Sequence, residues 1–369
     1  MTEANPNQSR KQSRLPLLGK VTLALFGSLL IAALVLPFLI STDPAEGAPP
    51  EELATEQSRF MNLTTNDNTA LLIHYLHAAG EGNSYPNRTD PEKADKPATD
   101  SAAGGSHRTT PMVLLHGFTL NAYSWQEIIP HLATSREVIA YDQIPYGLSA
   151  KPALEADEDV DYFSLAAAVD HLIALLDKQE IPNSILVGNS SGGAVALAAA
   201  HSHPERIEAL VLINPMATVE RMTLPDWLGH SPQVKRLNLL AARWFGSSTT
   251  LLEASYHDPA LISERRRELA LLHTQVEGWD LAWGEIFNRA LVEPLDVEQA
   301  IAEVSVPTLV VIGAEDTIID PQESQQLAET LQNADSLVIE DCGHLPHEEC
   351  PERTYEKISG WINALERAE

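Results

Sequence analysis

The chain has 369 residues, of which 44% are hydrophobic and 21% are charged. This composition is ordinary for a globular protein, and it excludes a wholly disordered chain. The formal net charge of −28 repels phosphate groups, so it argues against binding to nucleic acid. Two cysteines, Cys342 and Cys350, are too few for a disulfide scaffold or a four-cysteine metal site. A disulfide between these two would need an oxidising compartment, and the sequence leaves that pairing open.

The N-terminal region combines a basic tail with an apolar run. Residues 1–20 carry four basic side chains, and residues 21–40 are uncharged and predominantly apolar. A run of about 20 apolar residues matches the thickness of a bilayer core. We therefore predict a transmembrane anchor, with the tail in the cytoplasm and the rest on the extracytoplasmic side. The alternative is a signal segment whose cleavage releases a secreted protein.

The next part of the chain contains a linker, a hairpin and an insertion. Residues 41–57 are rich in Pro, Ala and Glu and are interpreted as a linker. Two apolar runs around a polar turn predict a β-hairpin over residues 60–77. Residues 78–108 have almost no large apolar side chains, so we expect a disordered surface loop there.

A repeating pattern of apolar runs and helical segments begins at Met112. The runs are short, continuous and rich in Val, Ile and Leu, which is typical of strands buried on both faces of a parallel sheet. They cover residues 112–117, 137–142, 184–190, 209–215, 307–313 and 335–341. Helical composition separates them, for example over 163–179 and 192–201. The alternation predicts an α/β fold with a doubly wound, mostly parallel sheet.

One long stretch interrupts this pattern. Residues 218–300 have no strong strand signal but contain helical segments over 234–244 and 261–276. We interpret this stretch as a helical cap inserted into the fold. The core would then consist of residues 58–217 and 301–369.

The strongest chemical signal is a serine between two glycines. Ser190 stands in Gly188-Asn189-Ser190-Ser191-Gly192, directly after a predicted strand and before a predicted helix. A G-x-S-x-G sequence in that setting is typical of a nucleophile elbow, in which only glycines leave room for the sharp turn. The pattern predicts Ser190 as the nucleophile.

A serine hydroxyl needs a base and an orienting acid to react at neutral pH. His344 follows the last predicted strand, with His347 as the alternative base. Asp316 follows the preceding strand and is the predicted acid, with Glu315 and Asp320 as nearby alternatives. The chain order is then serine, acid, histidine.

The fourth requirement is a pair of N–H donors for the oxyanion. Phe118 follows His116-Gly117 at the end of the first buried strand, and Ser191 follows the nucleophile. The backbone N–H groups of Phe118 and Ser191 are therefore the predicted oxyanion hole.

With these motifs in place, the chain from residue 60 onward resembles the α/β-hydrolase superfamily, in the serine-nucleophile branch that carries a helical cap. The resemblance rests on five motifs in order: His116-Gly117-Phe118, Asp142 to Ser149, Gly188 to Gly193, Gly313 to Asp316, and Gly343 to Glu352. It implies a cap and Asp316 as the acid. One departure is Ile144-Pro145, where relatives usually have P-G, in a loop that helps to shape the pocket rim in those relatives.

These residues predict a serine hydrolase that cleaves a small-molecule carboxylic ester or related acyl substrate through an acyl-enzyme. No metal or organic cofactor is expected. Carbon–carbon bond hydrolases, lactonases and acyltransferases share the same residues and remain alternatives. A non-catalytic binding protein with this fold is a further alternative. The sequence leaves the oligomeric state open.

Overall fold

The computed structural model describes residues 25–65 except 27 and 30, and residues 69–79, 109–152, 161–217 and 223–367. Its centre is an eight-stranded sheet with the order β1-β2-β4-β3-β5-β6-β7-β8. The strands are β1 Ser58–Thr64, β2 Ala70–Ala78, β3 Met112–Leu115, β4 Val138–Tyr141, β5 Ser184–Asn189, β6 Ile207–Ile213, β7 Thr308–Gly313 and β8 Ala334–Ile339. Every predicted strand is present, and so is the predicted hairpin, as β1 and β2.

The sheet is mixed. β1 and β2 pair antiparallel and β2 pairs antiparallel with β4, whereas all other neighbours are parallel. β3, β4, β5 and β7 are buried along their whole length, which explains their continuous apolar sequences. Because the parallel strands all end at one edge, the residues that follow them gather there.

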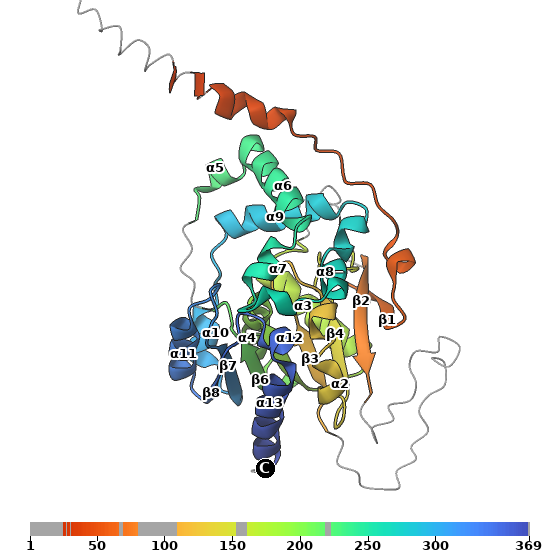
Figure 1. The fold of residues 1–369 in the computed structure, drawn as a ribbon, viewed down its shortest axis with the longest axis vertical. Coiled ribbons are helices and arrows are strands. Elements are labelled where there is room, and N and C mark those ends of the chain that lie inside the picture. The colour runs from red at the N-terminus through yellow and green to blue at the C-terminus, as the bar shows by residue number, and fades with distance from the viewer. Residues whose placement is uncertain are drawn as a thin grey trace, which may run out of the picture.

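Helices cover both faces of the sheet (Figure 1). One buried cluster joins the sheet to α3 Leu165–Lys178, α4 Ser191–Ser202, α10 Glu298–Glu303 and α11 Pro321–Thr330. The other joins it to α2 Ile129–Leu132, the 3-10 helix η3 Ala122–Trp125 and α13 Pro351–Glu366. α4 buries apolar side chains such as Val195 and Leu197 and packs on both β5 and β6, so the turn that precedes it is held by the core.

A set of helices follows β6 and precedes β7 in the sequence, and in space it lies beyond one end of the sheet (Figure 1). We call these the cap helices. They are α5 Asp226–Gly229, α6 Pro232–Gly246, α7 Thr250–Ala254, η5 Pro259–Leu261, α8 Glu264–Ala270, η6 Leu272–Gln275 and α9 Trp279–Val292. The helix predicted over 234–244 is present as α6, but the segment predicted over 261–276 is divided into η5, α8 and η6. The domain limits at 218 and 300 remain predictions.

The structure corrects the prediction of a transmembrane helix over residues 21–40. In the described part of the chain, no helix combines the length and the apolar character needed to cross a bilayer. Residues 25, 26, 28, 29 and 31–35 are helical, but Pro37 falls in the 3-10 turn η1 Leu36–Leu39, and Ile40 is extended. The predictions of a membrane anchor and of an extracytoplasmic location are therefore contradicted for the described residues, and residues 21–24, 27 and 30 of the predicted span lie outside them. The basic tail 1–20 lies outside the described residues, as does most of the predicted disordered loop 78–108.

The segment interpreted as a linker makes specific contacts with the cap helices. We call residues 41–57 the N-terminal strap; it runs along the cap helices down to β1 and includes the 3-10 helix η2 Pro50–Leu53 (Figure 1). Ala48 forms a parallel bridge with Val276, and Ala45 N donates to the buried Asp280 carboxylate over 2.9 Å. The strap is thus packed against the fold rather than separated from it.

Candidate active site

Ser190 occupies a strained turn between β5 and α4. Its φ of 52° and ψ of −119° are unusual for a residue other than glycine, and such strain is typical of functional turns. A Cβ on Gly188 would lie 2.5 Å from the Gly192 carbonyl oxygen, and one on Gly192 would collide with the Leu115 carbonyl. Only glycines fit at these two positions, so the local sequence explains how the turn forms.

His344 and Asp316 form a buried pair at the ends of the last two strands. His344 Nδ1 lies 2.7 Å from Asp316 Oδ2, and both residues are at least nine-tenths buried. The other oxygen, Oδ1, accepts from Ile318 N at 2.7 Å and Ile319 N at 3.0 Å. These two bonds fix the carboxylate, which in turn orients the imidazole ring through Nδ1.

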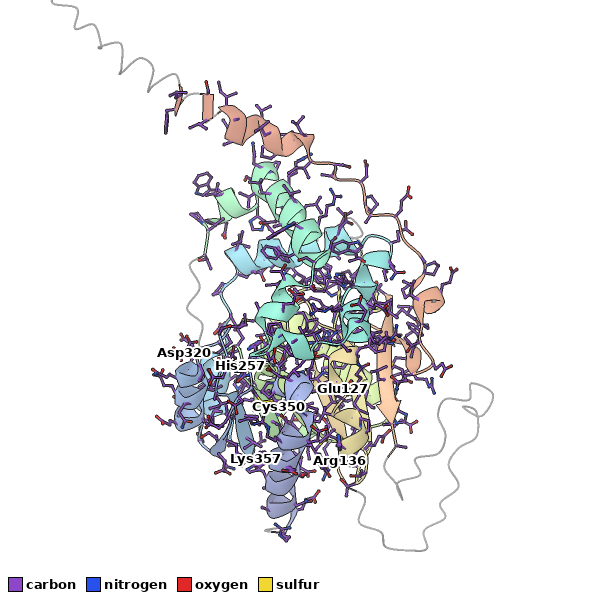
Figure 2. All side chains as sticks on the ribbon, viewed as in Figure 1. Glu127, Arg136, His257, Asp320, Cys350 and Lys357 are labelled. Atoms are coloured by element: carbon purple, nitrogen blue, oxygen red, sulfur yellow. A yellow bond between two sulfur atoms is a disulfide. The ribbon has the colours of Figure 1, made fainter. Side chains whose placement is uncertain are left out.

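The alternative acids and base lie elsewhere. Glu315 is exposed, and the exposed Asp320 accepts from Gln322 N at the start of α11; Figure 2 labels Asp320 at the periphery of the molecule. His347 is fully buried, stacked on Trp125, with Nε2 3.0 Å from Ser124 Oγ. Burial lowers the pKa of His347 to about 3, with smaller effects from Glu348 and Arg266. It therefore stays neutral in a packing role.

Two asparagines hold the loop of His344 (the histidine loop) against the strand ends next to the Ser190 turn. Asn189 Nδ2 donates to the His344 carbonyl over 3.2 Å, and Asn214 Nδ2 donates to the same oxygen over 3.0 Å. Asn214 Oδ1 also accepts from Gly313 N at 2.9 Å. Sequence reasoning missed both roles. The available signal was that each asparagine stands at or directly after the end of a central strand, where side chains meet at the sheet edge.

The loop His116–Phe118, which carries one of the two predicted oxyanion donors and which we call the oxyanion loop, lies directly beside Ser190. A Cβ on Gly117 would lie 3.1 Å from Ser190 Cβ and 2.8 Å from Asn189 Oδ1, so only glycine allows this approach. Gln143 N donates to His116 Nε2, so the His116 proton sits on Nδ1, which donates to the Gly117 carbonyl. Burial lowers the pKa of His116, which is consistent with this neutral form. The loop is therefore fixed by its own backbone contacts.

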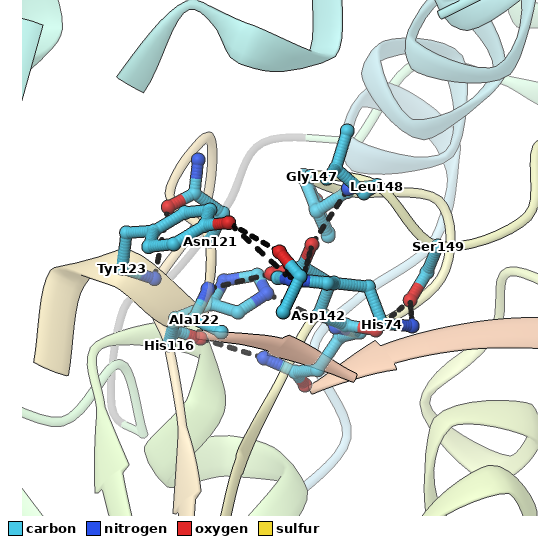
Figure 3. A network of polar contacts seen from close by, with 12 residues as sticks. His74, His116, Asn121, Ala122, Tyr123, Asp142, Gly147, Leu148 and Ser149 are labelled. Carbon is cyan, nitrogen blue, oxygen red and sulfur yellow. Dashed lines mark hydrogen bonds and ion pairs between the residues drawn. The ribbon is translucent and has the colours of Figure 1, made fainter. Parts of the chain in front are cut away.

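Asp142 lies at the centre of a network of polar contacts beside this loop (Figure 3). Its buried carboxylate accepts from Ala122 N and Leu148 N, each over 2.6 Å, and lies 2.8 Å from His74 Nδ1. Burial by itself would raise the pKa of Asp142, but His74 and these donors outweigh it and hold the pKa below its ordinary value. A Cβ on Gly147, where φ is +50°, would collide with this carboxylate. The Asp142–Ser149 motif is thus a framework for the oxyanion loop.

A buried ion pair joins the cap helices to the histidine loop. Arg266 on α8 donates from Nε to Glu348 over 2.6 Å and from a terminal nitrogen over 2.8 Å. Glu348 belongs to α12 Pro346–Glu349 and also accepts from Tyr256 and Ser124. Nearby, His344 N donates to the Ser255 carbonyl at 2.7 Å. No local pattern predicts this pairing, because its partners are 82 residues apart.

The two cysteines are joined by a disulfide that encloses the histidine. The bond links Cys342 and Cys350, with Cα atoms 6.4 Å apart and a sequence separation of 8 residues. Figure 2 labels Cys350 near the start of α13. His344 lies inside the closed loop, so the pairing that the sequence left open contributes directly to the geometry of this site.

Three of the predicted site residues line one pocket of about 470 Å³ between the strand ends and α9, whereas Asp316 and His344 are not part of its lining. Phe118, Ser190 and Ser191 all line it, and so do Gln143, Ile144 and Tyr146 from the loop that departs from the family pattern. Most of the remaining lining is apolar. Among the described residues, no cluster of three or more His, Cys, Asp or Glu side chains is arranged to hold a metal ion. The arrangement suits chemistry on a carbonyl group in a largely apolar cavity.

Comparison with known proteins identifies the family. A family model of the alpha/beta hydrolase fold matches residues 110–351, which is more than half of the chain. The protein therefore belongs to the α/β-hydrolase family, as the sequence resemblance indicated, and a hydrolase activity is supported by its relatives.

The similar proteins include carbon–carbon hydrolases and an esterase. The chain is 32% identical over 254 residues to a 2-hydroxymuconate semialdehyde hydrolase of Pseudomonas sp. (strain CF600), covering 66% of this chain and 82% of that protein. It is 22% identical to the solved meta-cleavage product hydrolase from Pseudomonas fluorescens IP01, with a TM-score of 0.58 and coverage of 83% and 98%. A thermophilic esterase from Thermogutta terrifontis has 21% identity, a TM-score of 0.59 and coverage of 83% and 98%. These two structural matches establish the fold alone.

Proposed function

We propose that the protein is a serine hydrolase that cleaves a carboxylic ester through an acyl-enzyme on Ser190. The observation that carries the proposal is the strained turn of Ser190 at the wall of an apolar pocket, with the His344–Asp316 pair on the adjoining loops. In this mechanism Ser190 Oγ attacks the substrate carbonyl while His344 Nε2 takes the hydroxyl proton. His344 then gives that proton to the leaving alcohol, and the acyl group stays on the serine.

The second half of the reaction repeats the same steps with water. His344 takes a proton from the water, whose oxygen attacks the acyl-enzyme, and the proton returns to Ser190 as the acid product leaves. The backbone N–H groups of Phe118 and Ser191 stabilise the negative oxygen in both tetrahedral intermediates, each worth roughly 3–4 kcal/mol. Asp316 keeps the His344 proton on Nδ1 and stabilises the ring when it is charged.

The test is labelling of the full-length chain with a fluorophosphonate probe. The full chain is required because the N-terminal strap packs on the cap helices. We expect labelling of the unmodified protein, none in Ser190→Ala, and full labelling in Ser202→Ala, whose hydroxyl lies at the exposed end of α4. Asp316→Asn should lower kcat on nitrophenyl esters by about 10⁴-fold, because the imidazole then holds the wrong tautomer. A well-folded protein that is never labelled would overturn the proposal.

A second candidate is hydrolysis of a carbon–carbon bond. The similarity to the semialdehyde hydrolase favours it, and the same residues would serve if the leaving group were a carbon rather than an oxygen. Turnover of a 2-hydroxy-6-oxo-dienoate, followed by loss of its absorbance, distinguishes the two. Faster turnover of this compound than of simple esters would make the carbon–carbon reaction the principal one.

A further inference from the structure

The pocket beside Ser190 has an unusual charge arrangement on an otherwise apolar wall. Much of the wall is hydrocarbon, including Ile144, Val195, Met216 and Ile286. Among the described lining residues, the charged ones are Arg289 and Glu293, both at the C-terminal end of α9. Arg289 is thus the one cation in this described lining that could meet an anionic group on a substrate.

The guanidinium of Arg289 is already surrounded by carboxylates. It lies 3.0 Å from Asp161, 3.4 Å from Glu285 and 3.0 Å from Glu293. Asp161 also accepts from Phe163 N and Ser164 N. Burial would raise the pKa of Asp161, but these bonds and Arg289 outweigh it and hold the pKa below its ordinary value. Three carboxylates around one guanidinium leave the cluster net negative at neutral pH.

A substrate carboxylate placed against the described lining would therefore lose part of its water, and the cation that it meets there is already paired with carboxylates. A buried and unpaired charge is strongly unfavourable, whereas an alkyl or aryl group gains from burial against the same walls. The overall charge of −28 adds a weaker, long-range repulsion in the same direction.

We propose that the pocket selects uncharged, apolar acyl groups and rejects acyl groups that carry a carboxylate, with the Arg289 cluster as the element that sets this selectivity. The inference rests on the proposed function, since it assigns the substrate class of the same site. It also separates this chain from hydrolases whose names specify a dienoate, such as the 2-hydroxy-6-oxo-2,4-heptadienoate hydrolase of Pseudomonas putida.

The experiment compares two p-nitrophenyl esters, the hexanoate and the adipate monoester. Their acyl chains have the same number of carbons and end in a methyl group and a carboxylate. We expect kcat/KM for the adipate ester to be lower by about 100-fold or more, as for burial of an unpaired charge. The variant Glu285→Gln with Glu293→Gln frees part of the guanidinium, and it should narrow this ratio by about tenfold through a lower KM for adipate. Glu329→Gln, on the exposed face of α11, should leave the ratio unchanged.

The outcomes are distinct from those that test the hydrolase itself. Equal turnover of both esters, with Ser190 still labelled by the fluorophosphonate, overturns the selectivity and leaves the hydrolase intact. No labelling and no turnover of either ester overturns both. An unchanged ratio in the double variant, once its melting temperature shows that it is folded, overturns the assignment to Arg289. If the double variant does not fold, Glu293→Gln alone gives the same comparison, because Glu293 is half exposed.

Discussion

At the scale of single residues, His273 links the cap helices to the oxyanion loop. It is 2% exposed and stacks on Trp283, with ring centroids 4.1 Å apart. Trp283 contacts Tyr146, whose ring in turn meets those of His116 and Phe118. Burial, with a smaller contribution from the nearby Lys151, lowers the pKa of His273 to about 3. The ring is therefore neutral in the folded protein, where its Nδ1 donates to the Ala270 carbonyl.

This neutral histidine predicts an acid-sensitive fold. The folded pKa of about 3 lies below the usual unfolded value of about 6.5, so the unfolded chain binds the extra proton between these two pH values. Stability is thus complete above pH ~6.5 and falls as the pH drops toward 3. We expect His273→Phe to remove part of this loss, up to about 2 kcal/mol between pH 7 and pH 5. Urea unfolding of the unmodified protein and of His273→Phe at both pH values measures the free energy of unfolding. If that free energy changes equally with pH in both proteins, His273 is not the source of the acid sensitivity.

At the scale of elements, the loop between β8 and α13 carries the proposed base. This loop has three sets of restraints: the disulfide between Cys342 and Cys350, the bonds from Asn189 and Asn214, and the Arg266–Glu348 pair. The asparagine bonds come from the sheet and the arginine from the cap helices. The disulfide is the one restraint of the three that a reducing agent removes, so its contribution is directly measurable.

We expect reduction of the disulfide to lower both stability and activity. Opening a closed loop of this length returns roughly 2–3 kcal/mol of chain entropy to the unfolded state. His344 then becomes less well positioned, so kcat on a hexanoate ester should fall more than KM changes. Melting temperature and kinetics with and without dithiothreitol measure both effects. The double variant Cys342→Ser with Cys350→Ser should have the melting temperature and kcat of the reduced protein, and dithiothreitol should change neither. Full activity of that variant would contradict the role of the disulfide in positioning His344.

At the scale of the whole molecule, the N-terminal strap joins the cap helices to the core. Asp280 is fully buried and binds Arg243, while Ala45 N donates to its other oxygen. Arg243 also donates to backbone carbonyls of the strap. Farther along, Tyr123 OH lies 3.0 Å from Thr55 Oγ1 and 2.8 Å from Ser58 Oγ. One continuous segment therefore touches α9, η3 and the start of β1.

The packing of the strap can be tested by adding one methyl group, through replacement of Gly47 by alanine. A Cβ on Gly47 would lie 2.5 Å from the Val276 carbonyl carbon and 2.6 Å from the Gln275 oxygen, so Gly47→Ala must displace the strap. We expect a loss of roughly 1–3 kcal/mol and faster proteolysis within residues 41–57. Gly360→Ala is the matched control, because its Cβ meets open space on α13 and should stabilise the helix by up to about 1 kcal/mol. A Gly47→Ala protein with an unchanged melting temperature would show that the strap is loosely held.

The sequence alone determined the family, the parallel sheet and the candidate residues Ser190, His344 and Asp316, whose catalytic roles remain proposals. Strands buried on both faces require continuous apolar sequences, and the tight turn requires glycines at a fixed spacing. Both patterns can therefore be recognised in the sequence. The same linear reading produced the error at residues 21–40, because the length of an apolar run does not specify where its helix ends, and here the α-helix gives way to the 3-10 turn Leu36–Leu39.

Only the tertiary structure decided which groups support that site. The asparagine anchors, the Arg266–Glu348 pair, the carboxylates around Arg289 and the docking of the strap all join segments far apart in sequence. Asp161 and Arg289 are separated by 128 residues, and Ala45 and Asp280 by 235. Polar residues of this kind are common on any surface, and their meaning depends on the partner that folding brings within hydrogen-bond distance. No local pattern specifies that partner, because long-range packing, and not residue spacing, sets the contact.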